Sequence, residues 1–435
     1  MKDFLGSNII NVKAHNMQAI LLSLLSVDSP DDRQLLSRIQ LAHKTNLSST
    51  TITNLVAELI EQGIVSEDKN PREDELLRPV GRPRTGLRLI PNARYVVGVH
   101  IGVGLYRVAL MNLRAEMKHS KFVNFAIETP PLDVLGQISQ DIQALLNEGG
   151  VERCLVLGVG VGASGLVDTL NGVNILAPNL GWHHIPIRDI LQNQVGLPVV
   201  VENNVRAMAL GEAYFGRGRE AQSLAFVYGR TGVGAGLVVE HQVFRGSSTG
   251  AGEIGHMILA PENGELCRCG NRGCLETLVS ESVILRKAQE AAHSLPGSLL
   301  ADWLARANDD LPPIERVFSA ARQGDSAAIE IVESAAHYLG IALANLVNIF
   351  NPELILLGGM FAQGQDLILP VTRQTLRQAA FAGLGEKVRL ETTRFGWRAG
   401  VTGAAALALL NLFYQPANSI APVNNPTAFS IQPTI

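Results

Sequence analysis

Apolar side chains recur at helical spacing three times near the start of the chain. The pattern predicts helices over 15–25, 34–45 and 49–62, with an acidic, proline-containing break at 28–32. The third helix has the most regular apolar stripe, formed by Ile52, Leu55, Val56, Leu59 and Ile60. Gly63 follows it, as expected for a glycine that ends a helix. Because only residues 46–48 separate the second and third helices, the pair is typical of a helix-turn-helix unit.

The polar face of the third helix indicates what this unit binds. Short side chains that can approach base edges and phosphates occupy it at Ser49, Thr50, Thr51, Thr53 and Asn54. A strand is predicted to begin at 64–65, and a charged stretch then leads to a basic tip at Arg82 and Arg84. Residues 1–90 are therefore predicted to form a winged helix-turn-helix DNA-binding domain.

Overall charge does not decide between DNA and another partner for this domain. Residues 1–90 contain eleven basic and eleven acidic side chains, so a helical protein-interaction module is compatible with the same composition. Only the order of helix, turn, polar-faced helix and basic wing favours DNA.

From residue 95 the pattern changes to alternating strands and helices. Strands are predicted over 95–101, 105–113, 122–127, 154–161, 224–228, 237–240 and 354–359, with helices over 132–146 and within 280–350. A hairpin, a further strand and a helix occur in this order twice, which indicates two similar lobes. Residues 91–415 are therefore predicted to form a two-lobed α/β domain, and residues 416–435, rich in Pro and Asn, a disordered tail.

Composition limits the alternatives. A chain of 435 residues with 46% hydrophobic side chains is expected to form two or three domains with substantial cores. The net charge of -4 argues against a chain coated with nucleic acid over its whole surface. Neither a signal peptide nor an apolar run long enough to span a membrane is evident, so a soluble, cytoplasmic protein is expected.

Three of the four cysteines gather in one short segment. Cys267, Cys269 and Cys274 lie among glycines, and His256 precedes them. Three thiolates and one imidazole are a usual ligand set for structural Zn²⁺, and Gly270 and Gly273 permit the turns that such a site needs. The alternative is a group of buried free thiols, which do not normally cluster beside glycines.

This segment also resembles a known family. Gly-Glu-x-Gly-His at 252–256, followed by Cys-x-Cys-Gly-x-x-Gly-Cys-Leu-Glu at 267–276, is similar to the signature of the ROK family of bacterial sugar kinases and transcriptional repressors. The resemblance implies an actin-like kinase fold and the same four zinc ligands. It also implies a sugar site formed by Asn179, Asn203, Glu253, His256 and Glu276. Turn and helix-cap roles remain an alternative for Asn179 and Asn203.

The kinase chemistry of the family is altered in this sequence. The phosphate motif Asp-x-Gly-Gly-Thr is matched here by residues 100–104, where His100 replaces the Asp and Val103 the second Gly. Asn204 occupies the position of the family's catalytic Asp, and an amide cannot accept the proton of the attacking sugar hydroxyl. The glycine stretch 231–236, expected to be a loop, matches the family's second phosphate motif. A working kinase is therefore not expected.

The sequence as a whole predicts a transcriptional regulator of the repressor type. Its partners would be double-stranded operator DNA and a sugar or sugar derivative, and its assembly a homodimer or homotetramer. Two alternatives stay open, namely an active ATP-dependent sugar kinase with a DNA-binding domain and a scaffold for protein interactions that does not bind DNA.

Overall fold

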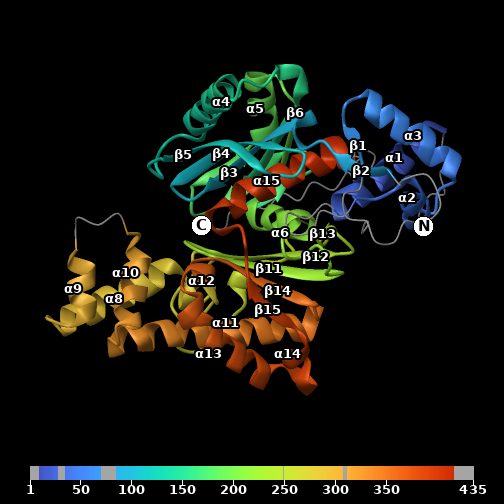
Figure 1. Ribbon diagram of the computed structural model, residues 1–435. Helices are drawn as coiled ribbons and strands as arrows, with labels where there is room; N and C mark the ends of the chain where they lie inside the picture. Colours follow the sequence, from blue (N-terminus) through green and yellow to red (C-terminus); the bar gives the residue numbers. More distant parts are fainter. Residues whose placement is uncertain (1–8, 28–34, 70–84, 248, 307–310, 416–435) are drawn as a thin grey trace.

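The computed structural model describes residues 9–27, 35–69, 85–247, 249–306 and 311–415 (Figure 1). Its N-terminal part, called the head below, consists of three helices and a two-stranded antiparallel sheet. These elements are α1 (Ile9–Val27), α2 (Arg38–Thr45), α3 (Ser49–Glu61), β1 (Val65–Lys69) and β2 (Thr85–Leu89). Arg82, Arg84 and the predicted tail 416–435 lie outside the described residues.

Local signals in the sequence set the helix boundaries of the head. A capping box starts α2, because the Ser37 hydroxyl accepts from the Gln40 N–H and the Gln40 side-chain oxygen accepts from the Ser37 N–H. At the start of α3, the Ser48 hydroxyl accepts from the Thr51 N–H. The second helix is shorter than the predicted 34–45, because Leu36 instead forms a β-bridge with Leu87 of the wing sheet.

The first lobe is built on a five-stranded sheet of order β10-β6-β3-β4-β5. Its elements are β3 (Tyr95–Gly102), β4 (Leu105–Asn112), β5 (Met117–Asn124), α4 (Pro131–Glu148), β6 (Val156–Ala163), α5 (Ile187–Val195), β10 (Val199–Asn203) and α6 (Asn204–Phe215). A small separate sheet consists of β7 (Leu166–Asp168), β8 (Val173–Ala177) and β9 (Trp182–Ile185).

The second lobe repeats this plan with a sheet of order β13-β12-β11-β14-β15. Its strands are β11 (Ser223–Gly229), β12 (Val233–Val239), β13 (Gln242–Phe244), β14 (Leu354–Gly359) and β15 (Arg389–Thr392). Its helices are α7 (Glu276–Val279), α8 (Glu281–Ser294), α9 (Leu299–Ala305), α10 (Pro313–Arg322), α11 (Ser326–Phe350), α12 (Met360–Gln363), α13 (Gln365–Ala379) and α14 (Leu384–Lys387). The last long helix is α15 (Ala399–Leu409).

The two sheets have the same topology. In each, three strands in chain order pair antiparallel, and two later strands add in parallel beside the first of them. This confirms the predicted duplication. Two boundary predictions were wrong. The strand expected at 122–127 is β5, which ends at Asn124, and the glycine stretch expected to be a loop from 231 to 236 is already strand β12 from Val233.

Helices α6 and α15 lie between the two sheets (Figure 1). Small side chains allow α15 to approach the first sheet closely. A Cβ atom on Gly160 of β6 would lie 1.9 Å from the Ala404 carbonyl oxygen, so no larger residue fits there. The lobes are thus joined through a layer of tightly packed helix.

The head packs directly on this central layer. Side chains of α1 and α3, such as Ile20 and Ile52, belong to the same buried apolar cluster as Leu407 of α15 and Tyr414. Arg219 adds polar contacts, because its guanidinium donates to the carbonyl oxygens of Leu25 and Ser26 at the end of α1, at 2.5 and 2.9 Å. The head is therefore joined to the lobes by both apolar packing and hydrogen bonds.

The surface and the longest helix bear on the environment of the protein. Within the described residues, α11 alone is long and apolar enough to cross a bilayer, but half of its most apolar window is buried inside the protein. A buried core helix of a soluble protein passes the same test.

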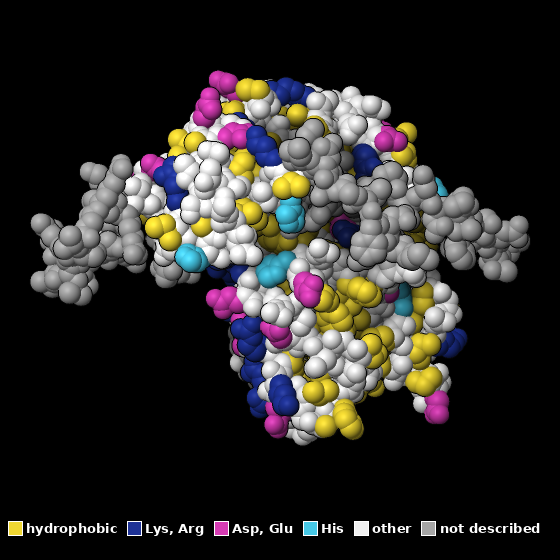
Figure 2. Space-filling model, turned by 90° about the vertical axis from the view of Figure 1, so that its right-hand side faces the viewer, with side chains coloured by type: hydrophobic (Ala, Val, Ile, Leu, Met, Phe, Trp, Pro, Cys, Tyr) yellow, Lys and Arg dark blue, Asp and Glu magenta, His cyan; other side chains and the backbone are white. Residues whose placement is uncertain are grey.

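On the face shown in Figure 2, apolar side chains gather over the lower half, which is the second lobe.

Candidate functional site

A cavity of about 500 Å³ lies between the lobes. The first lobe contributes His100, Ser164 and Asn204, and the second contributes Arg230 and residues 231–234. All five predicted sugar-binding residues line it, namely Asn179, Asn203, Glu253, His256 and Glu276. The fold thus brings together side chains that are up to 97 positions apart in the sequence.

Asn203 has a structural role as well as a place at the cavity. It is the N-cap of α6, and its Oδ1 accepts hydrogen bonds from the N–H groups of Val205 and Arg206, at 2.9 and 3.1 Å. Its Nδ2 donates to the Gly165 carbonyl oxygen at 2.8 Å. One N–H of the side-chain amide remains for a ligand, so the helix-cap interpretation and a binding role are compatible.

Two further polar groups are held in place at the cavity, namely the Glu276 carboxylate of the second lobe and the Asn179 amide, which follows β8 of the first lobe. One oxygen of Glu276 accepts from the Val233 N–H at 3.0 Å, which leaves its second oxygen for a ligand hydroxyl. The guanidinium of Arg268, which sequence reasoning missed, donates to Oδ1 of Asn179. Glu253 precedes the 3-10 turn Ile254–His256, and burial raises the pKa of its carboxyl group.

The predicted metal ligands converge at one end of the cavity. The ligand atoms of His256, Cys267, Cys269 and Cys274 all lie within 4.8 Å of one another. Cys269 Sγ is 3.6 Å from Cys274 Sγ, and Cys267 Sγ is 3.7 Å from His256 Nδ1. Ligands of a tetrahedral Zn²⁺ with bonds of about 2.3 Å are separated by about 3.7 Å, so the four residues fit this ion.

The backbone of this segment is shaped to hold the cluster. Gly273 has φ +69°, and a Cβ atom there would lie 1.9 Å from the Ala260 carbonyl oxygen, so glycine is required. His256 Nδ1 lies 3.7 Å from Cys267 Sγ, and the same residue lines the cavity. One imidazole can therefore serve both predicted roles, as metal ligand and as sugar contact.

The side chains of His100 and Asn204 line the cavity and are both uncharged. Asn204 Nδ2 donates to Ser164 Oγ at 3.1 Å and lies 3.5 Å from His100 Nε2, while its Oδ1 accepts from the Val205 N–H. Burial, with the charges of Arg230 and Arg107, lowers the pKa of His100 to about 3, so this imidazole is neutral. Among the described lining residues the carboxylates are Glu253 and Glu276, both on the sugar side.

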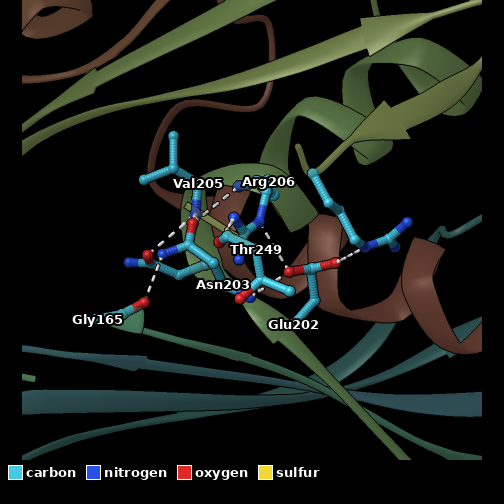
Figure 3. Close-up of polar contacts among 8 residues, drawn as sticks. Gly165, Glu202, Asn203, Val205, Arg206 and Thr249 are labelled. Atoms are coloured by element: carbon cyan, nitrogen blue, oxygen red, sulfur yellow. Dashed lines mark hydrogen bonds and ion pairs between the residues drawn. The ribbon is translucent and has the colours of Figure 1, made fainter. Parts of the chain in front are cut away.

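A buried charge network behind the cavity was not foreseen from the sequence (Figure 3). Glu202, fully buried at the end of β10, accepts from Arg206 Nε at 2.9 Å and from Arg245 Nε at 2.8 Å. Arg206 also donates to the Thr249 carbonyl oxygen. Because residues 245–249 lead to Glu253, the network ties one wall of the cavity to the other. The four-residue spacing of Glu202 and Arg206 could have predicted their ion pair from the sequence. No feature of the sequence indicates that Arg245 joins them.

The predicted DNA-binding face of α3 is exposed. Ser49, Thr50, Thr53 and Asn54 are open to solvent, whereas Thr51 is half-buried and its hydroxyl pairs with Ser48 at the helix cap. The Thr53 hydroxyl donates to the Ser49 carbonyl oxygen at 2.8 Å, which leaves it free only to accept from a partner.

Comparison with known proteins shows what this arrangement is similar to. A xylose repressor of Caldicellulosiruptor bescii is 28% identical over 92% of this chain and 98% of its own length. A glucokinase of Halalkalibacterium halodurans is 32% identical, but over only 72% of this chain and 94% of its own length. The crystal structure of a ROK family transcriptional regulator, a homologue of the Escherichia coli MLC protein, superposes with a TM-score of 0.75 at 27% identity, over 92% of this chain and 98% of that one.

The relatives separate according to the head. The repressor and the regulator extend over it, whereas the match to the glucokinase covers a share of the chain close to that of the two lobes alone. The sequence model of the ROK family matches residues 96–410, which include both lobes, the cavity and the cysteine cluster. The chain therefore belongs to the ROK family.

Proposed function

We propose that this protein is a DNA-binding transcriptional regulator, of the repressor type, whose affinity for operator DNA changes when a sugar or sugar derivative binds between the lobes. The observation that carries the proposal is the division of the cavity. Its sugar side retains carboxylates and amides that can bond hydroxyls, while Asn204 and a neutral His100 occupy the end where phosphotransfer would need a base.

The head supplies the DNA contact in this proposal. It is read as a winged helix-turn-helix, with α3 entering the major groove through Thr50 and Asn54 and the wing following the backbone. Arg82 and Arg84 would be the phosphate contacts of the wing. The repressor relative, which matches along almost the whole chain, supports this assignment.

The cysteine cluster is proposed to hold a structural Zn²⁺. A closed set of four protein ligands leaves no open position for chemistry, so the ion would fix the loop that carries His256 and Glu276 at the cavity. The protein is further proposed to act in the cytoplasm as a homodimer or homotetramer, because two heads related by a twofold axis fit a palindromic operator.

The effector acts only if it binds two lobe arrangements unequally. Closure of the lobes around a sugar would move α6 and α15, on which the head packs. Sugar binding would thereby change the spacing of two heads in a dimer and release the operator. The alternative, an active sugar kinase carrying a DNA-binding head, is kept as an outcome of the test because a glucokinase is among the relatives.

A thermal-shift screen against monosaccharides, amino sugars and their phosphates tests the proposal, combined with a coupled ATP assay on each hit. A ligand that binds only the folded state raises the free energy of unfolding by about 2.7 kcal/mol when its concentration is a hundred times its Kd. The melting temperature rises as a result. We expect at least one carbohydrate to do so without ATP turnover. If no carbohydrate raised the melting temperature, the proposed sensor would be contradicted. Rapid ATP turnover with a carbohydrate would instead establish the kinase.

A further inference from the structure

A second cavity, of about 320 Å³, lies where the head meets both lobes. Leu25 of α1 lines it from the head, and the turn 114–117 between β4 and β5 lines it from the first lobe. The end of α6, Arg219 and the stretch from Arg394 to Thr402 complete the wall. None of its described lining residues belongs to the sugar cavity, so it is a separate site.

The wall of this second cavity is strongly cationic. Among the described residues it contains four guanidinium groups and one carboxylate, namely Arg114, Arg219, Arg394, Arg398 and Glu116, a net formal charge of four minus one. Glu116 is already engaged, because its Oε2 accepts from the Asn112 amide at 2.8 Å. Glu212 interacts electrostatically with Arg394 and Glu220 with Arg219, so these carboxylates outside the lining offset part of the excess. A bound anion would balance the rest.

Two of the arginines are available to a ligand. Arg394 and Arg398 are exposed, and within the described part of the chain neither forms a side-chain hydrogen bond or ion pair. Burial and the charge of Arg394 together lower the pKa of Arg219, so these groups repel each other where no counter-charge lies between them. Arg398 and Thr402 also stand at the N-terminal end of α15, which favours negative charge.

The geometry matches phosphate best among small anions. Guanidinium groups present paired N–H donors that bond two oxygens of a phosphate at once, and three of them converge here. A cavity of about 320 Å³ admits a small molecule but not a duplex or a folded domain. We propose that this cavity binds a small phosphate-bearing molecule through Arg219, Arg394 and Arg398, as a second effector site.

The position of the site indicates how its ligand would act. Arg219 already holds the last carbonyl groups of α1, while Arg394 and Arg398 belong to the connection between β15 and α15. A phosphate shared by these arginines links the head to the lobes and biases the head's position. This consequence for DNA rests on the proposed function, whereas the binding itself does not.

Calorimetric titration at fixed ionic strength tests the site with three probes: inorganic phosphate, glucose 6-phosphate and glucose. The test variant is Arg394→Ala/Arg398→Ala, which changes only exposed side chains. The matched control is Arg377→Ala/Lys387→Ala, which removes two positive charges that are also exposed, on α13 and α14 outside the cavity.

We expect the wild type and the control to bind a phosphate-bearing probe alike, and the test variant to bind it about tenfold more weakly or worse. Any affinity for glucose should be unchanged in the test variant, because glucose has no phosphate. Tighter binding of glucose 6-phosphate than of phosphate identifies a phosphorylated metabolite as the ligand, and equal binding identifies phosphate itself. Equal affinity of test variant and wild type, or no binding of either phosphate-bearing probe to the wild type, overturns the site. Loss of the DNA function alone would leave these titrations unchanged.

Discussion

In the proposed function, the side chains of His100 and Asn204 distinguish a sensor from an enzyme. Both line the cavity between the lobes, and both are neutral at pH 7, because an amide does not titrate there and the pKa of His100 is lowered to about 3 by burial and by two neighbouring arginines. Asn204 bonds Ser164 and lies against the His100 ring. These two uncharged side chains occupy the place where a kinase would need a proton acceptor.

The buried imidazole of His100 should make the free energy of unfolding depend on pH. An unfolded His has a pKa of 6.5. Below this pH the imidazole of His100 is protonated in the unfolded chain but stays neutral in the folded protein. Stability is therefore lost as pH falls from about 6.5 towards 3. We expect the unfolding free energy to drop by about 2 kcal/mol more between pH 7 and pH 5 in the wild type than in His100→Gln.

Urea unfolding at the two pH values measures this difference. The control is His183→Gln, which removes an imidazole from an exposed position. It should behave as the wild type. A His100→Gln protein with the pH dependence of the wild type would contradict the buried, neutral state of His100.

The Glu202 network predicts unequal roles for its two arginines. Arg206 is 1% exposed and Arg245 32% exposed in their side chains. Replacing Arg206 by Met leaves the buried carboxylate short of its inner partner and should cost about 3 kcal/mol of unfolding free energy. Arg245→Met should lower the free energy of unfolding by about 1 kcal/mol, because water can take the place of a partly exposed guanidinium. Equal losses in denaturant titrations would show that the network is not organised around Arg206.

At the level of elements, the cysteine segment predicts one zinc per chain. Metal analysis of purified protein should find this stoichiometry in the wild type and in Cys154→Ser, whose exposed thiol lies outside the cluster. Cys274→Ser removes a buried ligand and should lose most of the metal and lower the melting temperature. Full zinc retention in Cys274→Ser would exclude the proposed ligand set.

Helix α3 predicts the DNA contact. Asn54→Ala removes an exposed amide from the face proposed to read bases, and should weaken binding of a selected duplex by about 1–3 kcal/mol, or about ten- to a hundredfold. Asn147→Ala makes the same change on the exposed side of α4 and should have no effect. Fluorescence anisotropy compares them, and equal affinities would remove α3 from the interface.

Most elements were predictable because their signals are local. The stripe of α3 is buried as its spacing indicates, and Gly63 ends that helix with φ +66°. Strand β12 was misread because its glycines resemble a phosphate loop. They are small for another reason, since a Cβ atom on Gly236 would lie 2.6 Å from the Val205 carbonyl oxygen of α6. Close packing against a helix distant in the sequence leaves no local mark.

The candidate site was predictable to the extent that its residues form motifs. The cysteine cluster and the five sugar-side residues meet as expected. Arg268 bonding Asn179, and Arg245 bonding Glu202, could not be found in this way, because each pair is far apart in the chain and follows from the folding of the second lobe's long loop. Long arginine side chains reach whatever carboxylate or carbonyl the fold brings near.

At the scale of the whole molecule, the head, the lobes and the two cavities form one connected system. The sugar cavity lies between the lobes, the layer of α6 and α15 joins them, and the head shares its apolar cluster with that layer. The arginine-lined cavity lies where the three parts meet. In the proposed function, a small molecule would change the position of the head through this arrangement, with a coupling free energy of about 1–3 kcal/mol.

The most direct test measures affinity for a duplex, selected by the protein from a random pool, with and without the carbohydrate that stabilises it. The account predicts that the carbohydrate weakens duplex binding by about tenfold or more in the wild type. It predicts no change in Glu276→Gln, which loses an acceptor of the sugar cavity, and no consumption of ATP. Duplex affinity that is indifferent to the bound carbohydrate, or transfer of phosphate from ATP to it, would contradict the account.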